Sequence, residues 1–475
     1  MIRFLGLLLG TLVLCAPQAT AAEPAKADPR PNILFCLADD WSWPHAGVYG
    51  DKVVKTPVFD KLVAEGMLFH RAHSAAPTCS ASRAAILTGQ WPHRLEEGAN
   101  LWGFLPKKFV TYPDILEGKG YVIGLTGKGW GPGSIKDAGR IRNPAGPDFK
   151  NFGEFLKTVP ADKPFCYFFG SRDPHRAYVL GSGVKSGMKP EDVTVPPYLP
   201  DTPEVRSDIC DYYFAVQRFD RDVGDILKQL ADSGRAENTL VIVTGDNGWP
   251  FPRCKANLYD SGTRQPFAVR WPAKVKPGRT SNAFVSLSDI APTVLEAAGI
   301  PVPKDMTAKS LIKHLTTDEK PTDRDMVFVE RERHAHVRQG NLSYPSRAVR
   351  TDRYLYIHNF RPDRWPAGEP ELVHSVGPFG DIDGGPSKDA VLKMRDSKFF
   401  RMACAKRPAE ELYDSQSDPH ELTNVADKPE YADAKAKMRA LLEKWMLDTA
   451  DPRVGKDGGD DRFDKYPYTG QPAKK

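Results

Sequence analysis

Two uninterrupted apolar runs, each ending in acidic residues, place the strongest constraint on how this chain folds. Residues 32–38 and 239–244 lack the polar alternation of a half-exposed strand, so each is predicted to be a parallel strand buried on both faces. Further strands are expected at 121–126, 165–170, 267–270 and 326–330, with helices at 58–65, 206–232 and 287–298. This alternation predicts an α/β sheet with helices on both faces.

The pattern changes beyond about residue 344. Short strands at 347–350 and 354–358 are expected to form a hairpin, and a long amphipathic helix is expected at 431–448. We therefore predict a large catalytic domain over residues 30–342, a smaller α+β subdomain over 343–450 and a loosely held tail over 451–475.

The N-terminus has the pattern of an export signal. A short basic start, an apolar run over residues 4–16 and the small residues Ala19-Thr20-Ala21 predict a signal peptide over residues 1–21. Cys15 leaves a lipoprotein signal as a minor alternative, which the bulky Leu14 disfavours. The expected location is the periplasm or the exterior, or a lysosome-like compartment in a eukaryote, without stable membrane insertion.

Charge and cysteine usage exclude other classes. The formal net charge of +5 is a mild basic excess, and no block of like charges suggests a partner nucleic acid. The six cysteines after the signal are scattered without a CxxC pair, which argues against a zinc site. A disulfide between Cys254 and Cys404 remains open, whereas Cys36 and Cys166 are expected to be small buried hydrophobes.

The acids that follow the two apolar runs suggest a metal site. Asp39-Asp40 follows the first run and Asp246-Asn247 the second, and ligands of open α/β sheets bind at such strand ends. Side-chain oxygens gathered there suit one hard divalent cation, with Ca²⁺ favoured and Mg²⁺ possible. Either pair alone is more often structural, since Asp commonly caps helices.

A third segment carries a resemblance to a known family. Cys79-Ser80-Ala81-Ser82-Arg83, followed by small residues and Thr88-Gly89, resembles the signature of type I sulfatases, in which the cysteine is oxidised to Cα-formylglycine. Ala81 stands where the family usually has proline. Several other segments resemble the heparan N-sulfatase (sulfamidase) branch: residues 173–176, 246–252, 257–259, 343–345, 411–414 and 418–421.

The resemblance implies an alkaline-phosphatase-like mixed sheet and the hydrolysis of sulfate groups from a sulfated oligosaccharide or polysaccharide. The substrate group it implies is the N-sulfate of glucosamine in heparan or heparin. A formylglycine-generating enzyme would be a partner during maturation. The hydrated aldehyde would offer two hydroxyls on one carbon, one to attack sulfur and one to expel sulfate. The implied metal ligands are Asp39, Asp40, Asp246, Asn247 and residue 79.

The resemblance also assigns roles to individual side chains. Arg83 would orient the aldehyde hydrate, Lys128 and Lys255 would bind the sulfate, and His175 would protonate the leaving group. The family has a histidine two residues after the lysine at position 128, but this chain has Trp130 there. Either His45 or water is therefore expected to take the part of that histidine, or turnover is slow.

Two further groups are candidates for substrate selection. A basic cluster (Arg331, Arg333, His334, His336 and Arg338) could bind anionic groups at the mouth of the pocket, with His334 and Arg338 as substrate contacts. A solvated loop explains the same charges equally well. Trp41, Trp43 and residues 249–251 could stack on a sugar ring, or simply pack in the core.

Three rival functions stay open. The first is an O-sulfatase acting on another polysaccharide. The second is a phosphomonoester or phosphonate hydrolase of the same superfamily, although the chain lacks the extra ligands of a paired-metal site. The third is an inactive glycan-binding homologue in which Cys79 stays unmodified.

Overall fold

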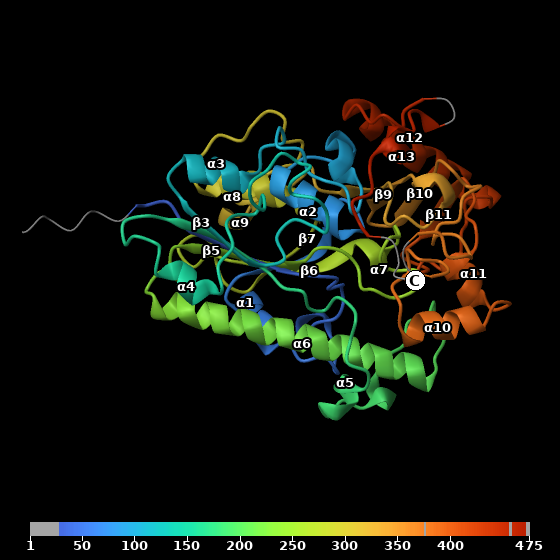
Figure 1. Ribbon diagram of the computed structural model, residues 1–475, viewed down its shortest axis with the longest axis horizontal. Coiled ribbons are helices and arrows are strands. Elements are labelled where there is room, and N and C mark those ends of the chain that lie inside the picture. Colours follow the sequence, from blue (N-terminus) through green and yellow to red (C-terminus); the bar gives the residue numbers. More distant parts are fainter. Residues whose placement is uncertain (1–27, 375–376, 456–457, 472–475) are drawn as a thin grey trace, which may run out of the picture.

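The computed structural model describes residues 28–374, 377–455 and 458–471. The predicted signal peptide, residues 1–21, lies outside them. The chain builds a seven-stranded sheet of order β3-β4-β1-β5-β6-β2-β7 and a four-stranded sheet of order β11-β10-β9-β8 (Figure 1). Among the described residues, no helix is long and apolar enough to cross a membrane.

The seven-stranded sheet is mixed, as expected for the predicted fold class. β1 pairs in parallel with both β4 and β5, and β3 pairs in parallel with β4, whereas β6 runs antiparallel between β5 and β2. The strands are β1 (Asn32–Ala38), β2 (Met67–His73), β3 (Val122–Gly127), β4 (Phe165–Gly170), β5 (Thr239–Gly245), β6 (Arg264–Arg270) and β7 (Arg279–Ser286). Every residue of β1 and β5 is buried, which confirms the prediction from their apolar runs.

Helices cover both faces of this sheet because successive side chains of a strand point to opposite faces. Ile33, Phe35 and Leu37 of β1 pack against one set of helices, α2 (Cys79–Thr88), α3 (Tyr112–Gly118) and α8 (Ile290–Ala297). Leu34 and Cys36 pack against the other set, α1 (Pro57–Ala64), α4 (Phe152–Leu156) and α6 (Pro203–Asp232). In Figure 1, α6 runs along one side of the molecule and α2, α3 and α8 lie on the other.

The second sheet is antiparallel and belongs to the C-terminal part. Its strands are β8 (Met326–Arg331), β9 (Ser346–Thr351), β10 (Tyr354–Asn359) and β11 (Glu410–Asp414). The predicted hairpin is therefore confirmed as β9 and β10. The predicted long helix is α12 (Ala432–Asp448), whose Leu442 and Trp445 pack on this sheet.

Strand β8 belongs to a different sheet from the one that the sequence pattern predicts. Residues 326–330 were expected to extend the α/β alternation, but β8 pairs with β9 in the second sheet. Val327 and Val329 are buried while Met326 and Phe328 are partly exposed, as in an antiparallel strand at a sheet edge.

The segment after residue 450 is not loosely held over its described residues, which corrects that expectation. Arg453 is fully buried and pairs with Glu332 at 2.7 Å, and Asp451 pairs with Arg347 at 2.6 Å. Phe463, in α13 (Arg462–Lys465), has no exposed surface. Composition misled here because buried ion pairs anchor a polar segment whose residues look solvated in sequence.

Short helices complete the fold. α5 (Ser182–Lys185), α7 (Asp260–Thr263), α9 (Ile312–Thr316), α10 (Pro386–Lys393) and α11 (Lys398–Cys404) connect the larger elements. The 3₁₀ turns are η1 (Gly47–Tyr49), η2 (Pro92–Arg94), η3 (Glu96–Ala99), η4 (Pro190–Asp192), η5 (Leu287–Asp289), η6 (Gln339–Asn341) and η7 (Pro429–Tyr431). All six cysteines of the described chain are free and buried, so Cys254 and Cys404 form no disulfide.

Candidate active site

The acidic residues predicted at the strand ends meet at one edge of the large sheet. The parallel register places Ala38 of β1 opposite Gly245 of β5, so the residues that follow the two strands are neighbours. The backbone N–H of Asp40 donates to Asp246 Oδ1 at 2.9 Å, and Asp40 has the left-handed backbone (φ 72°) that Asp tolerates better than most residues. Asp40, Asp246 and Asn247 are fully buried and Asp39 nearly so.

Cys79 lies at the same place because it opens helix α2. Its Sγ is 3.4 Å from Asp39 Oδ1 and 3.9 Å from Asp40 Oδ1. All ten residues of α2 are buried, and small side chains such as Ala81 and Ala84 allow that burial. Gly89 ends the helix in the left-handed conformation (φ 63°) that glycine adopts without strain.

Four side chains of this cluster lie close enough together to bind one cation. One ligand atom from each of Asp39, Asp40, Cys79 and Asp246 lies within 4.8 Å of all the others. Asn247 Nδ2 donates to Asp40 Oδ1 at 2.6 Å, which turns its Oδ1 the other way. That oxygen is buried and has no hydrogen-bond partner among the described residues. A buried oxygen of this kind is costly unless it binds a missing group, and the donor set suits a hard cation.

Three cationic side chains balance the three carboxylates. Arg83 Nε donates to Asp246 Oδ2 at 2.7 Å, Lys128 Nζ to both oxygens of Asp39 at 2.7 Å, and Lys255 Nζ to Asp40 Oδ2 at 2.8 Å. Arg83 has no exposed surface and also donates to the carbonyls of Lys128 and Gly129. The residues predicted for metal binding and for sulfate binding therefore converge on one buried cluster.

This environment shifts the pKa values of the cluster. Burial raises the pKa of Asp39, but Lys128 and Arg83 outweigh it and hold that pKa well below its usual range. Burial dominates at Asp246, whose pKa is raised although Arg83 opposes the shift. Burial also raises the pKa of the Cys79 thiol well above its ordinary value. An unmodified Cys79 would therefore be a neutral thiol and a poor nucleophile.

His175 reaches the cluster from the loop after β4. Its Nδ1 lies against the carbonyl oxygen of Arg176, which can only accept a hydrogen bond, so Nδ1 must carry the proton. Nε2 is then turned toward the cluster, 3.8 Å from Asp40 Oδ2. The side chain is 34% exposed, so it stands where the buried site opens to solvent.

One acidic residue of the site was not anticipated. Asp383, on the segment before α10, places Oδ2 3.2 Å from Lys255 Nζ. Its carboxylate, Asp40 and His175 have ligand atoms within 4.8 Å of one another. The only signal in the sequence is the run Gly-Asp-Ile-Asp-Gly-Gly over residues 380–385, which alone indicates no more than a loop.

The comparison with known families decides the class of the chain. The family described as Sulfatase matches residues 31–132 and 148–300, which is more than half of the chain. The chain belongs to the sulfatase family. A second family, described as N-sulphoglucosamine sulphohydrolase, C-terminal, matches residues 245–367 of this sulfatase.

Known proteins agree with this assignment. The sulfatase is 31% identical to the N-sulphoglucosamine sulphohydrolase of Homo sapiens over 90% of its own length and 92% of that protein. It is 30% identical to an ulvan-active sulfatase of Formosa agariphila, over 88% and 80% of the two chains. A protein solved in complex with its substrate D-glucosamine-2-N,6-O-disulfate shares the fold, with a TM-score of 0.63, 20% identity and coverage of 91% and 100%. The alkaline-phosphatase-like fold is thus confirmed, and the enzyme is a hydrolase of sulfuric esters or sulfamides.

The three arginines of the basic cluster of this sulfatase do not line the mouth of the pocket, which corrects the prediction for Arg338. Arg331 and Arg338 are buried and both donate to Asp381 Oδ2, at 2.7 and 2.6 Å. Arg333 is fully buried and donates to the carbonyls of Tyr466 and Pro467. These guanidinium groups link segments of the C-terminal part, because a buried charge needs an ion pair, as at Arg331 and Arg338, or hydrogen-bond acceptors, as at Arg333.

The two histidines of that cluster differ. His334 is buried, and its Nδ1 is 2.7 Å from Thr78 Oγ1, directly before Cys79. Burial lowers the pKa of His334 to about 4, so its ring is neutral and is no cationic contact for sulfate at neutral pH. His336 is partly exposed, and its ring stacks on His374 with centroids 4.2 Å apart.

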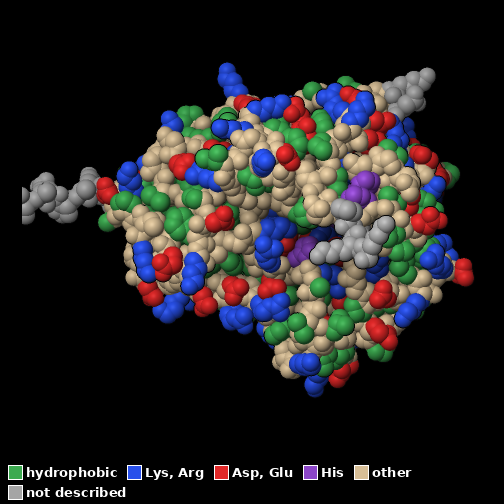
Figure 2. All heavy atoms as spheres, viewed as in Figure 1, with side chains coloured by type: hydrophobic (Ala, Val, Ile, Leu, Met, Phe, Trp, Pro, Cys, Tyr) green, Lys and Arg blue, Asp and Glu red, His purple; other side chains and the backbone are tan. Residues whose placement is uncertain are grey.

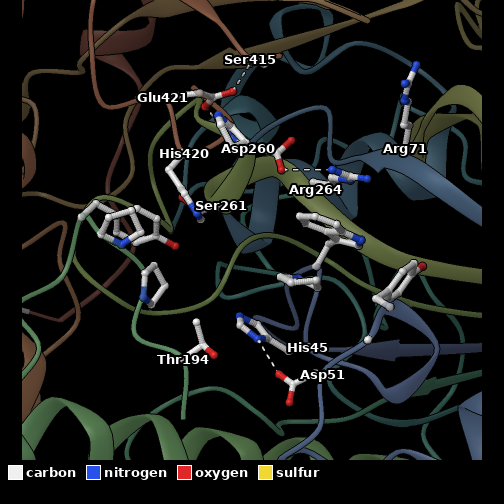
Figure 3. Close-up of a pocket in the computed structure, with 18 of the residues that line it drawn as sticks. His45, Asp51, Arg71, Thr194, Asp260, Ser261, Arg264, Ser415, His420 and Glu421 are labelled. Atoms are coloured by element: carbon white, nitrogen blue, oxygen red, sulfur yellow. Dashed lines mark hydrogen bonds and ion pairs between the residues drawn. The ribbon is translucent and has the colours of Figure 1, made fainter. Parts of the chain in front are cut away.

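The ring of His45 contacts side chains outside the cluster, which does not support it as a replacement for the absent family histidine. Its Nδ1 is 3.2 Å from Tyr213 Oη, and its ring packs on Trp249 with centroids 4.5 Å apart. It faces a separate cavity of about 760 Å³, where Figure 3 shows it paired with Asp51. Apart from His45, the predicted catalytic side chains are not among the described residues that line this cavity: Cys79, Arg83, Lys128, His175 and Lys255.

The aromatic side chains near the metal motifs mostly belong to the core. Trp41, Trp249 and Phe251 are each at most 2% exposed and pack in the apolar core on the α6 side of the sheet. Trp130 is also buried, and its Nε1 donates to the carbonyl of Ser80 at 3.1 Å beneath α2. Core packing is thus the observed arrangement, and only Trp43 is partly exposed, with Arg264 stacked 3.6 Å from its ring centre.

Proposed function

We propose that this sulfatase hydrolyses the N-sulfate group of glucosamine residues in heparan- or heparin-type saccharides, after Cys79 has been converted to Cα-formylglycine. The observation that carries the proposal is the position of Cys79, 3.4 Å from Asp39 within a buried cluster of three carboxylates and three cations. The preference for N-sulfate is supported by the 31% identity to human N-sulphoglucosamine sulphohydrolase over nearly the whole chain.

The residues present fit a single calcium ion. Asp39, Asp40, Asp246 and the unpartnered Oδ1 of Asn247 would hold it together with residue 79, and oxygen-rich sets with few waters favour Ca²⁺ over Mg²⁺. The three carboxylates and three cations of the cluster sum to zero charge, and Asp383 beside Lys255 lowers that sum by one. A divalent ion therefore leaves a net positive charge that attracts a sulfate anion. When bound, the ion would polarise the sulfate group as a Lewis acid.

The remaining roles fall to the chain's own groups. Lys128 and Lys255 present ammonium groups at the cluster and supply positive charge for the sulfate oxygens. Arg83 holds Asp246 and, through the carbonyls of Lys128 and Gly129, the loop after β3. His175 carries its proton on Nδ1 when neutral, so a second proton on Nε2 can pass to the leaving nitrogen.

Residue 79 supplies the nucleophile in this proposal. Formylglycine in its hydrated form would provide an oxygen nucleophile together with a route for releasing sulfate, which a buried neutral thiol does not offer. Conversion requires a formylglycine-generating enzyme during maturation, with Ala81 in place of the usual proline. The signal predicted at residues 1–21 would send the enzyme to the periplasm or the exterior.

Two measurements on one preparation test the proposal. Peptide mass spectrometry across Cys79 in enzyme from its native host should show loss of the thiol sulfur. The same material should release sulfate from N-sulfoglucosamine, whereas Cys79→Ala should release none. An intact thiol in native material would favour the inactive glycan-binding alternative.

A second candidate is O-sulfatase activity on another polysaccharide. It is supported by the 30% identity to an ulvan-active sulfatase, nearly equal to that of the first relative. N-sulfoglucosamine and glucosamine 6-O-sulfate assayed side by side would separate the two functions. Faster release from the O-sulfate would overturn the proposed specificity.

A further inference from the structure

We propose that Asp383 selects N-sulfated over O-sulfated substrates by binding the amine that leaves when the N–S bond breaks. This inference rests on the proposed function and names the residue that would determine its specificity. Asp383 belongs to the C-terminal part of the chain and lies outside both matched family regions.

The position of Asp383 places it beside the leaving group. Its Oδ2 is 3.2 Å from Lys255 Nζ and close to His175, the proposed proton donor. Its side chain is 24% exposed, whereas that of Asp40, on the other side of the Lys255 contact, has no exposed surface. Asp383 therefore stands at the opening of the site, where the sugar must lie when its sulfate group reaches the cluster.

The segment that carries Asp383 is fixed on both sides. Before it, Asp381 is held by Arg331 and Arg338, at 2.7 and 2.6 Å. The residue between Asp381 and Asp383 is also held, since the carbonyl of Ile382 accepts a hydrogen bond from Lys388 Nζ at 2.8 Å. A selecting group needs this kind of support to be held in a productive geometry.

A second anchor follows Asp383 and joins its segment to the His175 loop. Ser387 donates to Asp208 Oδ2 through its N–H at 3.1 Å and its hydroxyl at 2.6 Å. Arg176, next to His175, donates to both oxygens of Asp208 at 2.7 Å. Asp208, a buried aspartate on α6, therefore binds both the segment that carries Asp383 and the loop that carries His175.

The charge of Asp383 is opposite to what sulfate binding requires. A carboxylate at the opening repels a sulfate group and attracts a cation. The nitrogen takes a proton from His175 as the N–S bond breaks, so it carries positive charge in the transition state, where Asp383 can stabilise it. The electron pair of the bond then stays on nitrogen, which leaves as an amine, while the sulfuryl group passes to the nucleophile at residue 79. The amine takes a second proton from water and becomes an ammonium group, which Asp383 can bind. An O-sulfate leaves as a neutral alcohol and gains no such contact.

The competing explanation is that Asp383 only orients Lys255. Such a role would affect every sulfated substrate equally, because Lys255 is proposed to bind the sulfate group, which all of these substrates share. The substitution Asp383→Asn keeps the shape of the side chain and removes its charge. Asp389→Asn is the matched control, since Asp389 is exposed on the neighbouring helix α10.

The test compares kcat/KM for N-sulfoglucosamine, glucosamine 6-O-sulfate and an aryl sulfate in the mature enzyme. We expect Asp383→Asn to lower kcat/KM for the N-sulfate about 10- to 100-fold, as loss of a charged hydrogen bond predicts, and to change the other two less than about threefold. Asp389→Asn should leave all three unchanged. An equal loss on all substrates, or no loss on the N-sulfate, would overturn the inference.

A measurement on the unsubstituted enzyme covers the case in which the variant does not fold. Glucosamine should inhibit about tenfold more strongly than N-acetylglucosamine, which cannot form an ammonium group. Equal inhibition by the two sugars would count against Asp383 as an ammonium site. An enzyme that never cleaves N-sulfoglucosamine refutes the proposed function and this inference together, whereas cleavage without an effect of Asp383→Asn refutes the inference alone.

Discussion

The buried position of Arg338 predicts a loss of stability where the sequence suggested a loss of substrate binding. Arg338 donates to Asp381 Oδ2 at 2.6 Å and to the carbonyls of Trp365 and Pro366 at 2.8 and 2.9 Å. The substitution Arg338→Met fills similar space but removes all three charged hydrogen bonds. Breaking a buried ion pair by removing one partner costs about 3–5 kcal/mol. Because Asp381 keeps Arg331, we expect the lower end, about 3 kcal/mol.

Urea unfolding followed by circular dichroism would measure this loss, with Arg395→Met as the control at an exposed arginine. Kinetics with a small aryl sulfate should show little change in KM, because Arg338 does not reach the cluster. A variant of unchanged stability whose KM rises only for sulfated oligosaccharides would refute the reasoning. That result would restore Arg338 as a substrate contact.

Three further outcomes follow from the site. Removing the proposed calcium ion with a chelator should abolish sulfate release. The substitution Asn247→Leu should weaken calcium binding about tenfold or more in titration calorimetry, since it deletes the unpartnered Oδ1. Unchanged affinity would exclude Asn247 as a ligand. The substitution Trp130→His should not speed turnover. It should destabilise the enzyme by about 2–3 kcal/mol, because Trp130 is buried beneath α2. A faster single-turnover release of sulfate in this variant would contradict the first expectation. Burial lowers the pKa of His334 from 6.5 to about 4. Below pH 6.5 the unfolded chain therefore binds a proton that the folded protein does not, so the free energy of unfolding falls as the pH drops toward 4. Between pH 7 and pH 5 it should account for about 2 kcal/mol of the unfolding free energy, which His334→Asn should not show.

Local pattern was enough to predict five of the seven strands of the large sheet and the acidic residues at the floor of the site, but it missed β2 and β7. The apolar runs of β1 and β5 exclude any position except one buried on both faces, and acids directly after parallel neighbours must meet at one sheet edge. Cys79 and Arg83 followed from the motif because both lie on the same buried helix. The membership of β8 could not be predicted, since a short apolar run does not show which sheet it joins.

The residues at the opening of the site could not be predicted from the sequence, because long-range packing positions them. Arg331 and Arg338 look like a solvated or ligand-binding basic run until Asp381, more than forty residues later, is seen to pair with both. His45 lies five residues after Asp40, yet its ring turns away because it packs against Trp249. Spacing in the sequence indicates which residues are near a motif but not which way their side chains point.

The same packing explains how one site can treat two ends of a substrate differently. The floor, built from strand ends and α2, would be positive once a divalent ion joins Arg83, Lys128 and Lys255 against three carboxylates. The opening carries Asp383, which the C-terminal part supplies and buried arginines hold in place. Cleavage of an N-sulfate creates an anion at the floor and an ammonium group at the opening, so each product meets the opposite charge. Cleavage of an O-sulfate creates only the anion, and the carboxylate at the opening then contributes nothing, which is why the charge of Asp383 and not its shape should decide the specificity.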